Sequence, residues 1–401
     1  MTNNQDVIIV GARCAGSPTA MLLARQGHRV LVVDRATFPS DTVSTHVLHP
    51  RAGAALRRWG LLDAVIATGC PPISTYQFDF GPITISGTPA SPEGLPGYAP
   101  RRTVLDKILV DAAVAAGAEV REGFTVDEVL VEEGVVAGVR GRNADGRVAE
   151  ERAAVVIGAD GRNSMVARAV QAADYLTTPP LQFCVYSYWR DLPADGFEIY
   201  IRPDRGMAAV ATNDDETLLI VGWPTAEEQA YKADIEGNYL RTLDLVPDLS
   251  ERVARATRVD RFHTGAVPNS FRQSYGPGWL LLGDAGYVKD PITAQGIPDA
   301  FTDAERAAAA LDDVLAGRRS FDAAFADVQA TRDRLALPIF EFTKQLATLA
   351  PPPPEMQQLF GAMAGNQTAM DQFVSVTAGS LSPEVFFEPG NLQRLLGSPA
   401  V

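Results

Sequence analysis

VIIVGARCAGSPTAMLLARQGHRVLVVDR, residues 7–35, is the stretch of sequence that decides the fold. An apolar run, Val7 to Val10, enters a turn of small residues between Gly11 and Gly16, and an alanine- and leucine-rich helical segment follows. A second apolar run, residues 30–33, ends at Asp34. Because both runs are continuous rather than alternating, we expect parallel strands buried on both faces and joined by a crossover helix. The stretch therefore predicts an α/β fold.

Such a unit is suited to a dinucleotide. Its turn offers free N–H groups and the positive end of a helix to a diphosphate, and Asp34 stands where a carboxylate accepts hydrogen bonds from a ribose. Against the pattern G-x-G-x-x-G the chain has Gly11, Arg13 and Gly16. The middle position normally lacks a side chain so that the diphosphate can approach, so Arg13 must point away or contact the ligand itself. The alternative is a strand–helix–strand unit without a ligand.

The composition excludes several classes of protein. The chain has 401 residues, 46% hydrophobic and 21% charged, with a formal net charge of -14, which argues against nucleic acid or an anionic membrane as partner. Its three cysteines, Cys14, Cys70 and Cys184, give neither a disulfide framework nor a zinc spacing. No apolar run reaches membrane-spanning length, and from the polar start we expect no signal peptide. We expect a cytoplasmic protein with no metal site and no membrane span.

The chain alternates between two kinds of pattern. Aromatic and β-branched runs between residues 183 and 223 predict an antiparallel sheet. We also expect separate strands at 148–150 and 155–157, one helix over 226–243 and a strand over 258–263. The predicted organisation is a discontinuous dinucleotide domain over 1–75, 100–175 and 264–345, a sheet domain over 76–99 and 176–263, and a C-terminal helical segment over 346–401.

Two further stretches repeat the pattern of a buried strand followed by glycine and a carboxylate. They are VVIGADGRNSMVAR at 155–168 and WLLLGDAGYVKDPITAQGIPDAFTDA at 279–304. With the N-terminal stretch they resemble the three signatures of the class A flavoprotein monooxygenases typified by 4-hydroxybenzoate hydroxylase. Geranylgeranyl reductases, squalene epoxidases and flavin halogenases are relatives of that family. The resemblance covers residues 6 to 345, with the motifs in family order.

The resemblance implies an FAD-binding Rossmann-like domain of the glutathione-reductase type, with an inserted antiparallel sheet that covers the substrate. It implies FAD contacts by Gly11, Arg13, Cys14, Ala15, Gly16, Asp34, Arg35, Arg102, Asp160, Gly161, Ser164, Gly283, Asp284, Pro291, Ala294, Gln295, Gly296 and Ile297. Arg101 competes with Arg102 for its role. For Asp160 and Asp284 the alternative is capping of a turn at a strand end.

The loop at 291–296 has a physical role of its own. A reduced flavin carries negative charge, and this loop opens directly onto a helix that contains Pro298 in its first turn. The N–H groups at the start of a helix stabilise such an anion. We therefore expect the flavin ring to lie beside this loop.

The family's reaction supplies the functional prediction. The resemblance implies that NADPH or NADH reduces the flavin and that O₂ forms a flavin C4a-hydroperoxide, which hydroxylates an aromatic or polyketide-like small molecule. His46 lies in a loop that reaches toward flavin and substrate in the family, so it is the candidate for substrate contact or proton transfer. The alternative for His46 is a hydrogen-bonded loop histidine, and His49 is predicted to be structural. The protein would act as a monomer or homodimer.

Three rival functions stay open. A reductase of the geranylgeranyl type is suggested by GDAGYVKDPITAQGI at 283–297, although Asp303-Ala304 resembles the hydroxylases. A halogenase is disfavoured because the family's tryptophan signature is absent; the local tryptophan is Trp189. A flavin-binding or empty scaffold without catalysis is favoured only by Arg13, which could crowd the diphosphate.

Overall fold

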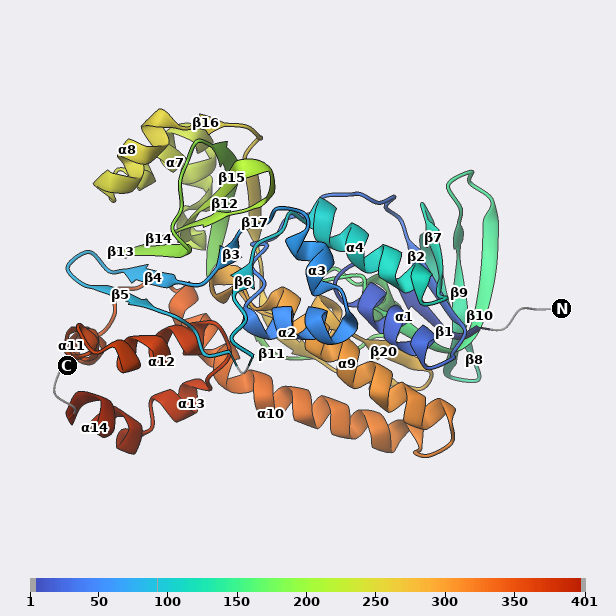
Figure 1. Cartoon of the computed structure of the whole chain (residues 1–401). Coiled ribbons are helices and arrows are strands. Elements are labelled where there is room, and N and C mark those ends of the chain that lie inside the picture. The colour runs from blue at the N-terminus through green and yellow to red at the C-terminus, as the bar shows by residue number, and fades with distance from the viewer. Residues whose placement is uncertain (1–4, 92, 398–401) are drawn as a thin grey trace.

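The computed structural model describes residues 5–91 and 93–397. It has two halves, an α/β half built on the N-terminal stretch and a half built on an antiparallel sheet (Figure 1). Residues 1–4, 92 and 398–401, which the predicted domain ranges include, lie outside the described residues. The fold class predicted from the sequence is confirmed.

A parallel sheet forms the centre of the α/β half. Its strand order is β20-β10-β1-β2-β7, with β19 antiparallel at the edge. Both faces are covered, as the continuous apolar runs predicted: Val7 and Ile9 pack against helices, while Ile8 and Val10 pack under β8, β9 and α5. The strands are β1 (Gln5–Val10), β2 (Val30–Asp34), β7 (Glu119–Glu122), β8 (Thr125–Glu132), β9 (Val135–Arg142), β10 (Val148–Gly158), β19 (Tyr275–Gly276) and β20 (Trp279–Leu281).

Helices bury their apolar sides on one face of this sheet. They are α1 (Gly16–Arg25), α2 (Pro50–Trp59), α3 (Leu62–Ile66), α4 (Arg102–Ala115) and α9 (Gly296–Leu315), while α5 (Met165–Ala169) lies on the opposite face. The expected separate strands at 148–150 and 155–157 are wrong, because β10 is continuous. Its first half pairs antiparallel with β9, and its second half pairs parallel with β1 and β20.

The second half is a sheet of order β16-β12-β15-β14-β13-β4-β5, with β17 also paired to β12. Its strands are β4 (Tyr76–Asp79), β5 (Thr84–Gly87), β12 (Gln182–Arg190), β13 (Phe197–Arg202), β14 (Arg205–Ala211), β15 (Glu216–Pro224), β16 (Thr257–Arg258) and β17 (His263–Ala266). Segments far apart in the sequence therefore build one sheet, since β4 pairs in parallel with β13. The predicted domain boundaries stay a prediction.

Two local expectations in this half are wrong. The helix expected over 226–243 is broken into α6 (Glu228–Lys232) and α7 (Ile235–Leu243), because Asp234 leaves the helical conformation and caps α7 through Gly237 N. The strand expected over 258–263 is split between β16 and β17. With α8 (Pro247–Arg255), α6 and α7 cover one face of the sheet.

The C-terminal helices cover the other face of that sheet (Figure 1). They are α11 (Pro354–Met363), α12 (Gln367–Thr377), α13 (Pro383–Phe386) and α14 (Pro389–Gly397), and the long α10 (Phe321–Ala347) leads to them along both halves. Two small sheets, β3 (Pro72–Ile73) with β6 (Gly97–Tyr98) and β11 (Asp174–Thr178) with β18 (Asn269–Arg272) and β21 (Tyr287–Val288), complete the chain. The C-terminal helices therefore share a core with the sheet.

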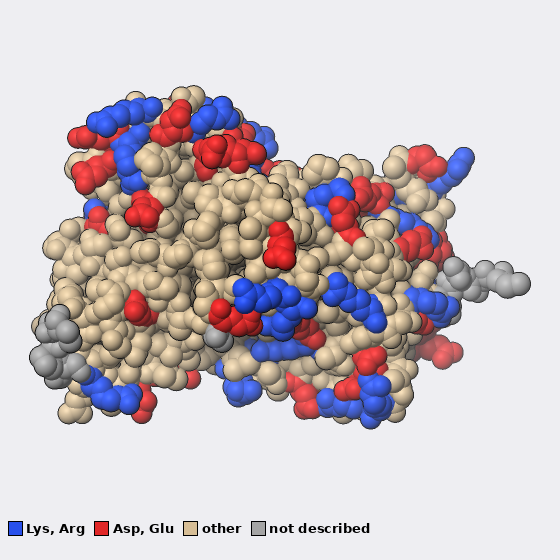
Figure 2. Space-filling view, in the orientation of Figure 1, with Lys and Arg blue, Asp and Glu red and all other residues tan. Residues whose placement is uncertain are grey.

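Charge and length give two further facts. On the face in Figure 2, acidic and basic side chains are interspersed, so neither sign of charge gathers in one large patch there. In the described part of the chain, no helix is long and apolar enough to cross a membrane.

Candidate functional site

A cavity of about 870 Å³ joins the two halves of the molecule. Its wall includes most of the predicted site residues: Gly11, Arg13, Cys14, Ala15, Asp34, Arg35, Arg102, Asp160, Gly161, Gly283, Asp284, Pro291, Ala294, Gly296 and Ile297. Four predicted residues, Gly16, Ser164, Gln295 and His46, are not part of the wall. The structure thus brings the three motifs together around one space.

The two glycines of the first turn are required by close packing. Gly11 has φ +106°, and a Cβ there would lie 2.3 Å from the carbonyl oxygen of Ala159. A Cβ on Gly16 would lie 1.8 Å from the carbonyl oxygen of Gly11. Because Gly16 has no side chain, it can pack against the carbonyl group of Gly11 within the turn. Because Gly11 has none, the first motif can pack against Ala159 of the central motif.

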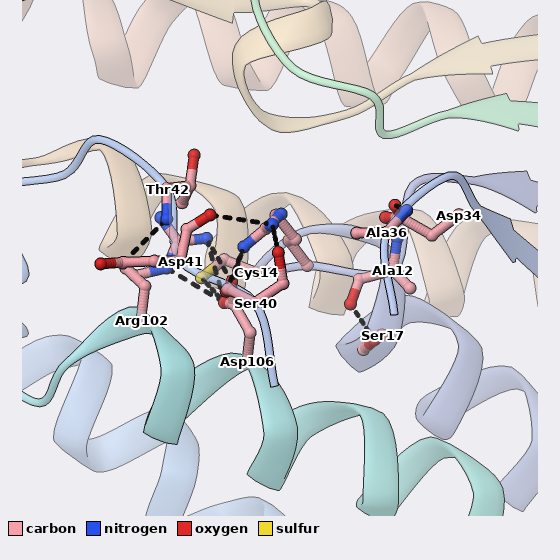
Figure 3. A network of polar contacts seen from close by, with 11 residues as sticks. Ala12, Cys14, Ser17, Asp34, Ala36, Ser40, Asp41, Thr42, Arg102 and Asp106 are labelled. Carbon is pink, nitrogen blue, oxygen red and sulfur yellow. Dashed lines mark hydrogen bonds and ion pairs between the residues drawn. The ribbon is translucent and has the colours of Figure 1, made fainter. Parts of the chain in front are cut away.

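Asp34 anchors the turn with both carboxylate oxygens. It accepts hydrogen bonds from the N–H groups of Ala12, at 2.7 Å, and Ala36, at 2.8 Å (Figure 3). Each oxygen keeps a free lone pair, and the side chain faces the cavity. Asp34 can therefore hold the turn and still accept hydrogen bonds from ribose hydroxyls.

Arg13 resolves the mismatch in the glycine pattern by pointing away from the turn. Its guanidinium donates to Oδ2 of Asp106 at 2.5 Å and to the backbone and side-chain oxygens of Ser40. Cys14 donates its thiol proton to the same carboxylate at 3.4 Å, and burial raises the pKa of that thiol. Arg13 thus ties the loop after β2 to α4, and Cys14 is a neutral packing residue.

Arg102, rather than Arg101, faces the cavity. It is buried and forms two hydrogen bonds of 3.0 Å with Asp106, so two guanidinium groups share one carboxylate. Arg101 turns toward the second sheet, where it donates to Glu216 at 2.7 Å and stacks 3.6 Å above the ring of Tyr188. The choice of Arg102 as the candidate cofactor residue is therefore favoured.

The central motif combines capping with an unsatisfied carboxylate. Ser164 accepts a hydrogen bond from Ala167 N at 2.9 Å, so it caps α5. Asp160 accepts from Met165 N at 2.6 Å through Oδ2, but its buried Oδ1 has no hydrogen-bond partner among the described residues. Ser164 and Oδ2 of Asp160 thus act as caps, as the alternative proposed. Oδ1 of Asp160 has no such role and can accept a hydrogen bond from a ligand.

Asp284 lies in the cavity wall. Protein surrounds it, yet its side chain is accessible from the cavity, and burial raises the pKa of its carboxyl. The preceding Gly283 donates its N–H to Asp303 at 3.1 Å, and a Cβ on Gly283 would lie 3.1 Å from Cβ of Ala15. This packing places the third motif directly against the first.

The loop at 291–296 forms the next part of the wall. It contains a short turn of 3₁₀ helix, Pro291–Thr293, and a left-handed Ala294, and α9 begins at Gly296 without a side-chain cap. Its uncapped N–H groups suit an anion, as expected. Gln295 does not join them: its side chain accepts from Arg51 at 2.5 Å and donates to Thr377 O at 2.6 Å, away from the cavity.

The prediction that His46 contacts the substrate disagrees with the structure. His46 is buried outside the cavity wall and shares a hydrogen bond of 2.5 Å with the hydroxyl of Tyr188. Burial, with Arg102 and Arg101 nearby, holds the pKa of His46 well below its usual value, so the ring stays neutral. The loop holds this residue in a left-handed conformation, φ +61°, that turns it to the second sheet.

His49 reaches the cavity instead. Its Nε2 donates to the carbonyl of Thr293 at 2.9 Å, so its Nδ1 accepts from the hydroxyl of Tyr76 at 3.0 Å. Burial lowers the pKa of His49 to about 4. A neutral His49 thus braces the loop at 291–296 against the second sheet.

Two neighbouring charged residues were missed by the sequence reasoning. Lys289 is buried in the wall and forms an ion pair with Asp299, which also binds Arg51 at 2.5 Å. Asp290 is 1% exposed and also lies in the wall. The only signal available was their place directly before Pro291 in the third motif.

Comparisons with known proteins agree with this geometry. The family model described as FAD binding domain matches residues 4–333. The chain belongs to this family. Digeranylgeranylglycerophospholipid reductase 1 of Methanopyrus kandleri is 32% identical over 73% of this chain and 76% of its own. The 6-methylpretetramide 4-monooxygenase of Streptomyces rimosus is 29% identical over 82% of this chain and 80% of its own. The crystal structure of a flavoprotein/dehydrogenase from Cytophaga hutchinsonii has the same fold, with a TM-score of 0.84 at 19% identity over 98% of each chain.

The protein is therefore an FAD-dependent oxidoreductase that uses NAD(P)H. The wall fits FAD: Gly11 and Gly16 let the first turn pack closely at the cavity, and Asp160 and Asp284 offer carboxylate oxygens there. When bound, FAD supplies the redox chemistry that couples NAD(P)H oxidation to O₂. Among the chain's own residues, His49 braces the loop at 291–296, beside which the flavin ring is expected.

Replacing Asp284 with alanine tests its expected contact with FAD hydroxyls. Removing a charged acceptor from a buried site costs about 1.5–3 kcal/mol, so the dissociation constant for FAD should rise about 10- to 150-fold. Titration of the apoprotein with FAD, followed by flavin fluorescence, measures this. An unchanged dissociation constant would show that Asp284 does not contact the cofactor.

Proposed function

We propose that the protein is a flavin-dependent monooxygenase that hydroxylates an uncharged, apolar aromatic or polyketide-like molecule. The observation that carries this proposal is the composition of the wall beyond the loop at 291–296. That part of the cavity has the aromatic and aliphatic lining of a substrate chamber. We also propose that FAD is held by the predicted residues that line the cavity.

The second sheet and the C-terminal helices build this chamber. The sheet contributes Phe78, Phe197, Ile199 and Ile220, and the helices with the segment between them contribute Phe342, Leu346, Met356, Phe360, Phe373 and Phe387. Phe78 and Phe373 meet edge to face with centroids 5.3 Å apart, so the two walls interlock. Flat apolar molecules suit such walls.

The chamber carries little charge. Among the described lining residues from the second sheet and from residues 342–387 there is no Lys, Arg, Asp or Glu. Lys289 is paired with Asp299, so it does not offer a free cation to a substrate carboxylate. Placing an unpaired charge in such surroundings costs several kcal/mol, which favours a neutral substrate.

A relative supports the same class of substrate. The Streptomyces rimosus enzyme, whose name gives 6-methylpretetramide as its substrate, covers most of this chain. We infer a neutral substrate of this broad kind, and we propose that the protein acts in the cytoplasm, as a monomer or homodimer, with the domain ranges predicted from the sequence.

Oxygen uptake tests this proposal. FAD-loaded protein with NADPH, or with NADH, should consume O₂ faster when 2-naphthol is added. The charged analogue 6-hydroxy-2-naphthoate should stimulate at least about tenfold less, because its carboxylate finds no partner in the chamber. Equal stimulation by both compounds would contradict the neutral substrate class, and no stimulation by any phenol would contradict hydroxylation of phenols.

A double-bond reductase is the second candidate. The 32% identical Methanopyrus kandleri relative, named as a reductase, favours it. A reductase would consume NAD(P)H and saturate an isoprenoid such as geranylgeraniol under argon. Saturated product formed without O₂, together with unchanged naphthol, would replace the proposed function by this one.

A further inference from the structure

We propose that Asp290 is a catalytic residue that binds the hydroxyl group of a phenolic substrate and accepts its proton. This proposal rests on the proposed function, since it names the group that would receive the substrate. Asp290 lies in the cavity wall directly before Pro291, where the substrate chamber meets the expected flavin loop.

One carboxylate oxygen of Asp290 accepts hydrogen bonds from the protein, and the other accepts none among the described residues. Its Oδ1 accepts from Nε2 of Gln182 at 2.6 Å and from the N–H of Ile292 at 3.0 Å. Its backbone N–H donates to the side chain of Asn269 at 2.8 Å. Its buried Oδ2 has no hydrogen-bond partner among the described residues. A buried carboxylate oxygen without a partner calls for a donor, and a substrate hydroxyl is one.

The orientation of Gln182 depends on a glycine. A Cβ on Gly222 of the neighbouring strand would lie 2.4 Å from Oε1 of Gln182, so the side chain fits only because that position has none. Gln182 itself is 2% exposed. Its amide is therefore fixed, and it fixes one edge of the Asp290 carboxyl.

The surroundings let Asp290 exchange a proton near neutral pH. Burial raises the pKa of Asp290 to about 7, although the hydrogen bonds from Gln182 and Ile292 lower it. The groups that face it are Gln182 and Cys184 from β12, Asn269 from β18, and the adjacent Lys289, whose ammonium is paired with Asp299. Among the described residues, no cation forms an ion pair with Asp290, so no ion pair competes with a substrate hydroxyl for the unpartnered Oδ2.

The proposed step is a simple proton transfer. The O–H bond of the substrate breaks, the proton moves to Oδ2 of Asp290, and the electron pair of the bond stays on the phenolic oxygen. The electron-rich phenolate ring is then more readily attacked by an electrophilic oxygen. The ionised form of Asp290 performs this step, so activity should rise as the pH increases through about 7.

Binding tests the contact without turnover. Holoprotein at pH 8 is titrated with 2-naphthol and with 2-methoxynaphthalene, which lacks the O–H, while the flavin absorbance is followed. The wild type should prefer 2-naphthol about tenfold, as expected for a hydrogen bond to a charged group, and Asp290→Asn should reduce this preference to about twofold. The control Asp333→Asn, on the side of α10 that contacts Tyr175, should keep the wild-type preference.

The pH profile tests the proton transfer. The kcat/KM of the wild type for 2-naphthol should increase through pH about 7, and Asp290→Asn should be slower and lack this inflection. Gln182→Met removes a hydrogen-bond donor that lowers the pKa of Asp290, so the inflection in the kcat/KM profile of this variant should move to higher pH. This shift tests the proton transfer even if Asp290→Asn does not fold. The inference is overturned if the variants keep both the wild-type preference and inflection. If the wild-type protein hydroxylates no phenol, the proposed function is wrong. The binding preference for 2-naphthol over 2-methoxynaphthalene would still test the contact with Asp290.

Discussion

Replacing Asp106 with alanine is expected to lower the free energy of unfolding by about 3–5 kcal/mol and to abolish most FAD binding. Asp106 has a fully buried side chain and balances the guanidinium groups of Arg13 and Arg102. Without it, Arg102 is a buried cation with no carboxylate hydrogen-bonded to it, and the loop that carries Ser40 loses its link to α4 through Arg13. Urea unfolding and FAD titration measure the two effects.

The same helix provides a matched control. Asp111 forms an ion pair with Lys107 in which both side chains are exposed, so Asp111→Ala should change stability by no more than about 0.5 kcal/mol. The double variant Asp106→Ala with Arg13→Met should be less destabilised than the sum of the single variants, because each removes half of one ion pair. Additive losses, or an Asp106→Ala protein as stable as the control, would show that the shared carboxylate does not organise this site.

Gly11→Ala is expected to have the second largest effect, a loss of more than about 3 kcal/mol of unfolding free energy together with loss of FAD. The substitution combines strain at positive φ with a Cβ 2.3 Å from the carbonyl of Ala159. Gly27→Ala separates the two causes, since Gly27 has φ +91° but nothing within 4 Å of the added Cβ.

The control should lose only about 1 kcal/mol, the cost of the conformation alone. Its FAD affinity should stay at the wild-type value, because Gly27 is not part of the cavity wall. Thermal unfolding and the flavin absorbance of the purified proteins give both quantities. Equal losses for Gly11→Ala and Gly27→Ala would mean that the contact between the first and central motifs is not what requires glycine.

The arrangement of the motifs could be predicted from the sequence because it depends on local patterns. The apolar runs at 7–10 and 30–33 are continuous in the sequence and buried on both faces in the structure. Asp34 ends β2, Asp160 lies two residues after the end of β10, and Asp284 lies three residues after the end of β20. Strands of a parallel sheet bring their carboxyl ends to one edge.

Side chains that act across the two halves could not be predicted in the same way. His46 and His49 are three residues apart in the sequence, yet His46, with a left-handed backbone, lies outside the cavity wall and His49 lies in it. Arg13 looked like an obstacle because its partner, Asp106, is distant in sequence. This contact removes the crowding argument for a scaffold without catalysis. Asp290 had no visible role until the fold placed Gln182 beside it.

Isotope labelling with ¹⁸O₂ tests the central claim, that this FAD-dependent oxidoreductase is a monooxygenase. FAD-loaded protein is incubated with NADPH and 2-naphthol under ¹⁸O₂, and the product is analysed by mass spectrometry. We predict a hydroxylated naphthol that contains one oxygen atom from O₂. A product that has gained hydrogen but no oxygen, or whose new oxygen comes from water, would contradict the account.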